Sequence, residues 1–235
     1  RGLGDVYKRQ VYLYLETEQL ALKCGVLANG QYTSSDRGIS GASTIVLEYV
    51  LDTPSLNLRY GVSLISVEQA KRNLEREINN YDLKVLSEAG RRIWNEKLGK
   101  ISVTGGSEQD KTVFYTSLYR TYERMICISE DGKYYSAFDG KVHNDYGIPF
   151  YTDDWIWDSY RAAHPLRILM DQKKQTNIIR SYLRMSELSS DHWFPNFPEV
   201  TGDSRRMNCN HGVAIIADAW YKGLRDFNLQ EAYVY

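Results

Sequence analysis

Ser66-Val67-Glu68-Gln69 is the stretch at which the sequence changes from a strand-like to a helix-like pattern. Ser66 stands three residues before Gln69, which is the spacing of a capping box, where a serine side chain accepts hydrogen bonds from the backbone amides that open a helix. Apolar residues then recur at helical spacing, which indicates an amphipathic helix. These residues are Val67, Ala70, Leu74 and Ile78.

The residues before this stretch have the composition of β-strands. Residues 11–15 and 44–50 are rich in β-branched and aromatic side chains, and residues 58–64 alternate between apolar and polar. Asn29-Gly30 is a strong turn sequence between such runs. Because this is too little sheet to form a domain alone, we expect residues 11–64 to be the C-terminal part of a β-sandwich domain.

The residues after this stretch are predicted to be mainly helical. A helix is predicted at 83–98, which makes residues 65–100 a helical linker, and a short strand is predicted at 101–103. Asp131-Gly132 and Asp139-Gly140 supply the turns of a predicted hairpin. Long aromatic-rich loops between helices indicate a helical toroid whose loops build a pocket at one end. The remaining helices are predicted at 111–124, at 154–170 with a bend or break near Pro165, at 175–188 and at 211–224.

The overall composition argues against several classes of partner and site. Lys and Arg number 29 and Asp and Glu number 30, so the net charge of −1 provides no field that recruits nucleic acid or an anionic membrane. No apolar run approaches the roughly 18 residues of a membrane span. Cys24, Cys127 and Cys209 are far apart and odd in number, which argues against a disulfide framework or a zinc cluster.

The segment from Asp154 to Arg161 is the sharpest local signal for chemistry. On one helix, Asp154, Trp157, Asp158 and Arg161 would share a face. Such a set suits a sugar, because carboxylates accept from hydroxyls, an indole covers the C–H face of the ring, and an arginine orients the acid. An ordinary polar face, with acidic residues near the positive helix N-terminus, is the alternative interpretation.

Two further segments carry candidate contacts. In Trp193-Phe194-Pro195-Asn196-Phe197-Pro198, two prolines stiffen a loop that holds three aromatic rings, either as an exposed platform for carbohydrate or as a hydrophobic plug between helices. Met207-Asn208-Cys209-Asn210-His211-Gly212 opens the last predicted helix. An asparagine there is most often a cap, and a single histidine is more often structural than a ligand or sugar contact.

Five motifs, in order along the chain, resemble glycoside hydrolase family 92, whose members are exo-acting α-mannosidases. The resemblance runs from about residue 11 to the end of the chain, and the ordered set is more specific than any one motif. The motifs are Ser66-x-Glu68-Gln69-Ala70-x-x-Asn73-Leu74, Phe114-Tyr115-Thr116-Ser117-Leu118-Tyr119, Phe138-Asp139-Gly140-Lys141-Val142-His143, Trp157-Asp158-x-Tyr160-Arg161-x-x-His164-Pro165-Leu166, and Asn208-Cys209 with Ala217-Asp218-Ala219-x-x-Lys222-Gly223.

The resemblance implies a fold and an activity. The fold would be the end of an N-terminal β-sandwich, a helical linker, and the first helices of an (α/α)6 toroid that forms the N-terminal part of the catalytic domain at 101–235. The activity would be an inverting, calcium-dependent removal of terminal α-linked mannose from glycans, of the α-1,2-mannosidase type, by a secreted, periplasmic or cell-surface bacterial enzyme. A mannose-containing glycan would be the partner and calcium the cofactor.

The resemblance also implies where the glycan would bind. Trp157 and Asp158 would line the pocket for the terminal mannose, and we expect the substrate site to include Arg161, Trp193, Asn208 and Cys209 as well. The family's general acid, general base and usual calcium-binding stretch belong to its C-terminal half, so no catalytic role is assigned within this chain. Arg205-Arg206-Met207 stands where many members carry an acidic residue, which leaves the linkage preference open.

Both ends of the chain look cut. Residues 1–10 resemble the translation of a sequencing adaptor, and residues 232–235 stop inside a predicted helix without a capping signal. We therefore expect a fragment that is inactive without the remainder of its own polypeptide. Two other interpretations stay open: another (α/α)6 glycosidase with its catalytic acids inside this chain, and a non-catalytic carbohydrate-binding protein that uses the aromatic loop.

Overall fold

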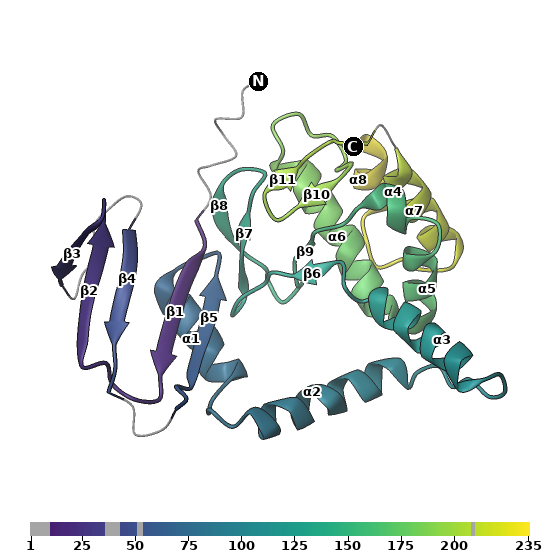
Figure 1. The fold of residues 1–235 in the computed structure, drawn as a ribbon. Helices are drawn as coiled ribbons and strands as arrows, with labels where there is room; N and C mark the ends of the chain where they lie inside the picture. The colour runs from purple at the N-terminus through teal and green to yellow at the C-terminus, as the bar shows by residue number, and fades with distance from the viewer. Residues whose placement is uncertain (1–9, 36–42, 51–53, 208–209) are drawn as a thin grey trace. The chain divides into compact units, whose positions relative to one another are not determined.

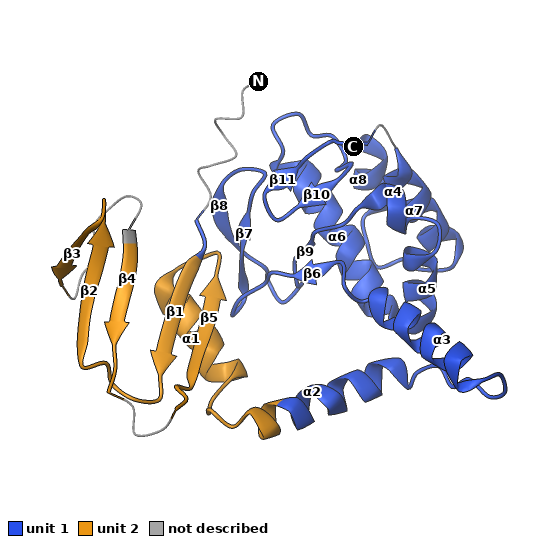
Figure 2. Cartoon of the chain, viewed as in Figure 1, with its two compact units in different colours: residues 1–11, 87–235 blue, residues 12–86 orange. Residues whose placement is uncertain are grey.

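The computed structural model describes residues 10–35, 43–50, 54–207 and 210–235 (Figure 1). The chain divides into two compact units, unit 2 at residues 12–86 and unit 1 at residues 87–235 together with the first eleven residues (Figure 2). Strands dominate the first part of the chain and helices the second, as the sequence patterns predict. In the described part of the chain, no helix is both long and apolar enough to cross a membrane.

Unit 2 consists of short antiparallel sheets and one helix. β1 pairs with β5 so that Tyr12 lies opposite Ser63, and β2 is the centre of a three-stranded sheet in the order β3-β2-β4. The strands predicted from composition are confirmed as β1, β4 and β5. The elements are β1 (Tyr12–Thr17), β2 (Lys23–Ala28), β3 (Gln31–Ser34), β4 (Ser43–Glu48), β5 (Leu58–Ser63) and α1 (Val67–Glu77).

Helix α1 begins where the capping signal predicts and packs on β5. The Ser66 side chain accepts from the Gln69 amide at 3.1 Å. Ala70 and Leu74 on the buried face are 0% and 1% exposed. Gly61 in β5 lies directly beneath this face, because a Cβ at this position would overlap the carbonyl oxygen of Ala70. The close approach of strand and helix therefore depends on the absence of a side chain at Gly61.

Gly61→Ala is expected to destabilise unit 2 by about 1–3 kcal/mol, because the added methyl group must push backbone atoms apart. The matched control is Gly90→Ala in α2 (Leu83–Leu98), where a Cβ would meet nothing within 4 Å. That change should raise stability by up to about 1 kcal/mol, since alanine is the better helix former. Urea unfolding measures the change in the free energy of unfolding for both variants. A Gly61→Ala protein as stable as the wild type would contradict the close contact.

The core of unit 1 is built around one long helix. Ile178, Ile179, Tyr182 and Met185 of α6 are each 0% exposed, and α5 and α7 pack beside them. The elements are α2, α3 (Glu108–Arg120), β6 (Ile126–Cys127), β7 (Lys133–Ser136), β8 (Lys141–Asn144), β9 (Tyr151–Thr152), α4 (Ile156–Ser159), α5 (Ala163–Met170), α6 (Gln172–Leu188), β10 (Pro198–Glu199), β11 (Gly202–Asp203), α7 (His211–Tyr221) and α8 (Leu229–Val234).

Several predicted elements are confirmed, with shifted ends. The helix predicted at 83–98 is α2, and Asp139-Gly140 is the turn between β7 and β8. The predicted strand at 101–103 is wrong. The Tyr115 hydroxyl instead donates to the carbonyl of Ile101 at 3.1 Å and accepts from the amide of Val103 at 3.4 Å, so a side chain satisfies this backbone in place of a partner strand.

The helix predicted at 154–170 is two helices, α4 and α5, and the break does not lie at Pro165. Pro165 occupies the first turn of α5, where an amide has no intrahelical partner and proline is tolerated. The helix is interrupted instead at residues 160–162, which form a turn between α4 and α5. The boundaries of the helical linker, placed between residues 64 and 65 and between residues 100 and 101, stay predictions.

Candidate functional site

The polar stripe predicted on one helical face does not form as such. Asp154 precedes the four-residue helix α4 and is 1% exposed, whereas Trp157 is 48% exposed and Asp158 and Arg161 are also exposed. The reason is a long-range hydrogen bond. The amide of Asp154 donates to the carbonyl of Pro198 at 2.9 Å, which holds Asp154 outside the helix and turns its side chain inward.

Asp154 is the centre of a buried polar network. Its carboxylate accepts from Ser159 Oγ at 2.7 Å, from His164 Nε2 at 3.0 Å and from the Tyr182 hydroxyl. His164 is 1% exposed, and its Nδ1 lies 2.9 Å from Nε2 of Gln175. No sequence pattern singled out this network, although His164 belongs to a family motif.

The network keeps Asp154 ionised. Burial by itself would raise the pKa of Asp154, but the hydrogen bond and charge of His164 and the hydroxyls of Tyr182 and Ser159 outweigh it, so the pKa lies below the usual 3.8. Burial and the neighbouring Asp154 carboxylate raise the pKa of Tyr182 well above its ordinary value. Tyr182 therefore acts as a permanent hydrogen-bond donor to a buried carboxylate.

Arg161 interacts with Tyr160 and not with Asp158. Arg161 Nε donates to the Tyr160 hydroxyl at 2.9 Å, and Tyr160 stacks on His211 with ring centroids 3.9 Å apart. The expectation that Arg161 orients the Asp158 carboxylate is thus wrong for this structure. Within the described residues, no hydrogen bond or ion pair engages the Asp158 carboxylate, and the stacked His211 ring links the start of α7 to the residue that follows α4.

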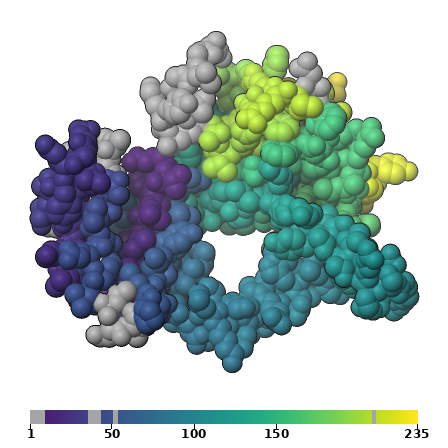
Figure 3. Space-filling model, viewed as in Figure 1, coloured from purple at the N-terminus to yellow at the C-terminus, as the bar shows by residue number. Residues whose placement is uncertain are grey.

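The aromatic loop 193–198 contains one exposed ring and one buried ring. Trp193 is 68% exposed, whereas Phe197 is 5% exposed and stacks on Trp155 with ring centroids 5.5 Å apart. The carbohydrate platform stays a prediction. Asp203 holds the loop by accepting from the amides of Asn196 and Phe197, both at 2.8 Å. The segment around β10 and β11 lies at the face of unit 1 seen in Figure 3.

A cavity of about 390 Å³ lies beside this loop. Arg205, three residues before the predicted contact Asn208, and Asn210, directly after the predicted contact Cys209, both line it. Asn208 and Cys209 themselves lie outside the described residues. Trp157, Asp158 and Arg161 are not part of the lining. The lining residues are Trp193, Phe194, Asn196, Asp203, Arg205, Asn210 and Tyr235.

Arg205 lines this cavity and forms an ion pair with Asp191, which precedes the aromatic loop. The Asp191 carboxylate accepts from Ser189 Oγ at 2.6 Å, from Arg205, and from the amide of Trp193 at 3.2 Å. The hydrogen bonds from Ser189 and Arg205 lower the pKa of Asp191 to about 2. Arg205 also lies over the Trp193 ring, 5.7 Å from its centroid. Asp191 and Asp203 were not predicted, and their place shortly before and after the aromatic loop is the signal that could have found them.

The aromatic loop 193–198 is expected to lose protection from hydrogen exchange at low pH. The folded pKa of Asp191, about 2, is below the ordinary 3.8, so its contribution to stability is present above about pH 4 and is lost as the pH falls toward 2. Hydrogen exchange at residues 189–205 between pH 5 and pH 2.5 measures the change. Asp191→Asn should abolish it, and Asp218→Asn on α7 is the control that should keep it. A wild-type loop equally protected at both pH values would contradict the role of Asp191.

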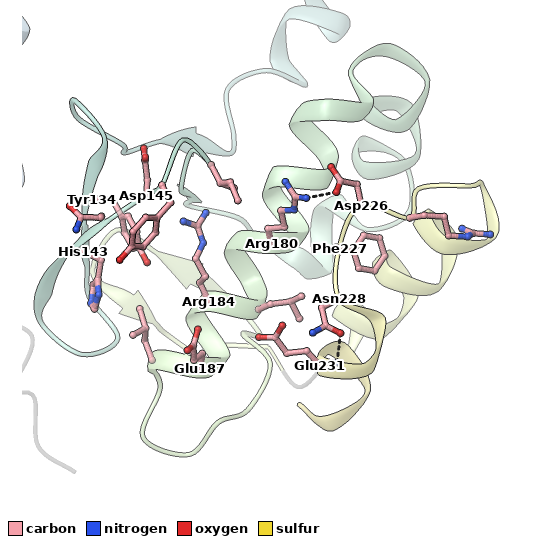
Figure 4. A pocket seen from close by; sticks show the side chains of 16 residues that line it. Tyr134, His143, Asp145, Arg180, Arg184, Glu187, Asp226, Phe227, Asn228 and Glu231 are labelled. Carbon is pink, nitrogen blue, oxygen red and sulfur yellow. Dashed lines mark hydrogen bonds and ion pairs between the residues drawn. The ribbon is translucent and has the colours of Figure 1, made fainter.

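A second cavity of about 700 Å³ lies between the β7–β8 hairpin, α6 and the segment before α8 (Figure 4). Arg180 pairs with Asp226 at 2.5 Å, and the Arg184 guanidinium lies 5.1 Å from the ring centroids of Tyr134 and Phe150. Burial, and secondarily the charge of Glu187, raise the pKa of Glu231 on its wall. Of the predicted substrate-binding residues that the structure describes, none lines this cavity.

Comparison with known proteins decides the family. The profile of the glycosyl hydrolase family 92 catalytic domain matches residues 69–235. The chain belongs to glycosyl hydrolase family 92. Among solved structures, it is similar to a family 92 inverting mannosidase from Bacteroides thetaiotaomicron, with a TM-score of 0.81 and 26% identity over 96% of this chain and 31% of that one.

Two further proteins are similar to this chain in fold or in part of the sequence. A family 92 α-mannosidase from the same bacterium has the same fold, with a TM-score of 0.84 at 22% identity over 96% of this chain and 31% of that one. An uncharacterized secreted glycosidase from Arthroderma benhamiae is 34% identical over 70 residues, which cover 28% of this chain and 9% of that protein. The chain thus spans less than a third of the length of these relatives.

The residues around the first cavity do not fit the calcium ion that the family resemblance implies. Calcium requires six to eight oxygen ligands, usually with several carboxylates. In the described part of the chain, no group of three or more Asp, Glu, His or Cys side chains could hold a metal. Asp203 is the acidic side chain among the described lining residues, and it already accepts from two backbone amides; Asp191, which pairs with the lining residue Arg205, is not part of the lining.

Proposed function

We propose that this chain is the glycan-binding part of a glycoside hydrolase that removes terminal α-linked mannose. The observation that carries the proposal is the exposed pair Trp157 and Asp158 on α4. An exposed indole next to a carboxylate without a described partner offers a sugar both a stacking face and a hydroxyl acceptor. Family membership and the mannosidase description of the 26% identical neighbour support mannose as the sugar.

Neither Asp191 nor Asp154 suits the role of general acid. A general acid must be protonated at the working pH, and the pKa of Asp191, about 2, leaves it ionised. Asp154 is ionised too and cannot reach a substrate from a site that is 1% exposed. An inverting mechanism needs an acid and a base about 6.5–9.5 Å apart, with a water between base and sugar. In the proposal, these two groups and the calcium ligands come from other residues of the full-length protein.

A non-catalytic carbohydrate-binding protein is the second candidate. It is favoured by the exposed Trp193 platform and by the absence of a suitable general acid among the described carboxylates of the first cavity. Another (α/α)6 glycosidase would need an acid within this chain, and Glu231, which lines the second cavity and has a raised pKa, is a candidate among the described residues. For localisation we propose a secreted, periplasmic or cell-surface protein, in line with the fungal relative's description as secreted.

The test uses the full-length protein and aryl α-mannosides and α-glucosides. We expect turnover of the mannoside, with β-mannose as the first anomer seen by NMR, loss of activity with a chelator, and recovery with calcium. Binding of mannose without turnover would favour the carbohydrate-binding protein, and turnover of the glucoside alone would favour another glycosidase. Residues 1–235 by themselves are expected to give no turnover.

A further inference from the structure

One buried carboxylate joins the segments that frame the proposed glycan site. The Asp154 carboxylate accepts hydrogen bonds from Ser159 at the end of α4, His164 in α5 and Tyr182 in α6. Its backbone amide donates to Pro198, at the end of the aromatic loop. At 1% exposure, Asp154 cannot touch a ligand itself. Its effect on a site must therefore pass through the residues bonded to it.

The α4 turn depends on such support. A helix of four residues is far below the roughly 12–15 residues at which isolated helices become stable, and the Trp155 N-cap makes no side-chain capping bond. Two contacts hold the turn from below. Ile156 is 0% exposed in the core, and Ser159 Oγ donates to Asp154 at 2.7 Å. Trp157 and Asp158 lie between these two anchors and face solvent.

We propose that Asp154 is a positioning residue that, through Ser159, holds the α4 turn and so sets the placement of Trp157 and Asp158 against the glycan. The proposal rests on the proposed function for the role of those two residues. His164 and Tyr182 hold the carboxylate from the core side, so the Ser159 bond connects a rigid base to the exposed turn. Sites need this kind of support, because a displacement of about 1 Å can cost a hundredfold in rate.

The experiment compares two serine-to-alanine changes in the full-length protein. Ser159→Ala removes the hydroxyl that ties α4 to Asp154. Ser186→Ala removes a buried hydroxyl of α6 that donates to the Tyr182 carbonyl at 3.1 Å and has no bond to α4. Hydrogen exchange at the amides of residues 158–160 reports the turn, exchange within α6 reports the fold, and titration with methyl α-mannoside reports the site.

Ser159→Ala is expected to speed exchange at residues 158–160 about tenfold and to weaken mannoside binding at least fivefold, with α6 protected as in the wild type. Ser186→Ala should change neither the turn nor binding by more than twofold, and Ser159→Thr, which keeps a hydroxyl, should restore both. Wild-type exchange in Ser159→Ala, or a looser turn with unchanged binding, would overturn the positioning role. If the wild type neither binds nor hydrolyses mannosides, the proposed function fails, and the exchange data alone decide whether Asp154 holds the turn.

Discussion

Asp154→Ala is expected to destabilise unit 1 by about 3–5 kcal/mol, the cost of removing one partner from a buried charged network. His164 and Tyr182 are 1% and 0% exposed, so they would lose their acceptor without gaining water in its place. Net stabilities of domains are only about 5–15 kcal/mol, so the loss is a large fraction of the total. Urea unfolding of the full-length protein, together with hydrogen exchange in α5 and α6, measures the effect.

Asp158→Ala is the matched control for stability. It removes the same side chain four positions along, but from an exposed site without a described partner, where substitutions usually change stability by less than about 0.5 kcal/mol. A urea midpoint shifted equally by both changes would contradict the buried network. A wild-type midpoint in Asp154→Ala would contradict it as well.

In the full-length protein, Asp158 is expected to matter for activity although it contributes little to stability. Asp158→Ala is expected to lower kcat/KM on an aryl α-mannoside at least tenfold, because a lost hydrogen bond to a charged group costs about 1.5–3 kcal/mol. Trp157→Ala should give a loss of similar size, since stacking on the sugar is removed. Steady-state kinetics on proteins with wild-type melting temperatures measures both.

The control for this second prediction is Asp218→Ala. Asp218 lies on α7, and its carboxylate pairs with Lys222 at 2.7 Å on the surface. The change removes the same charge without touching α4, so kcat/KM should stay within about twofold. Wild-type kinetics in a well-folded Asp158→Ala protein would leave the Trp157–Asp158 pair with a structural role only.

Elements governed by neighbouring residues were predictable. The Ser66 cap, the helix at 83–98 and the Asp139-Gly140 turn depend on side chains and backbone within a few positions, and all three are present. The family could also be predicted, because short motifs in a fixed order survive as sequence even where no single contact is visible. The prediction of a strand at 101–103 was wrong, because the Tyr115 hydroxyl, from a later helix, forms the hydrogen bonds of the Ile101 carbonyl and the Val103 amide.

The candidate site was predictable in its residue types but not in its geometry. Periodicity alone placed Asp154, Trp157 and Asp158 on one face, and Trp157 and Asp158 are indeed exposed together. Whether Asp154 joined them depended on a hydrogen bond to Pro198 and on His164 and Tyr182, which no local pattern specifies. Arg161 is a second example, because it donates to the Tyr160 hydroxyl, and the Tyr160 ring stacks on His211 from the distant helix α7.

Local sequence was thus sufficient for the strand-to-helix change at Ser66, the family and the pairing of an indole with a carboxylate, because caps, periodicity and motif order are encoded within short windows. Tertiary contacts alone decided that one aspartate is buried and its neighbour exposed, and that Asp191 and Asp203 hold the aromatic loop. The physical reason is that burial and hydrogen-bond partners depend on segments distant in sequence. A carboxylate that looks like a sugar contact in a helical pattern can therefore be the buried support of the one that is exposed.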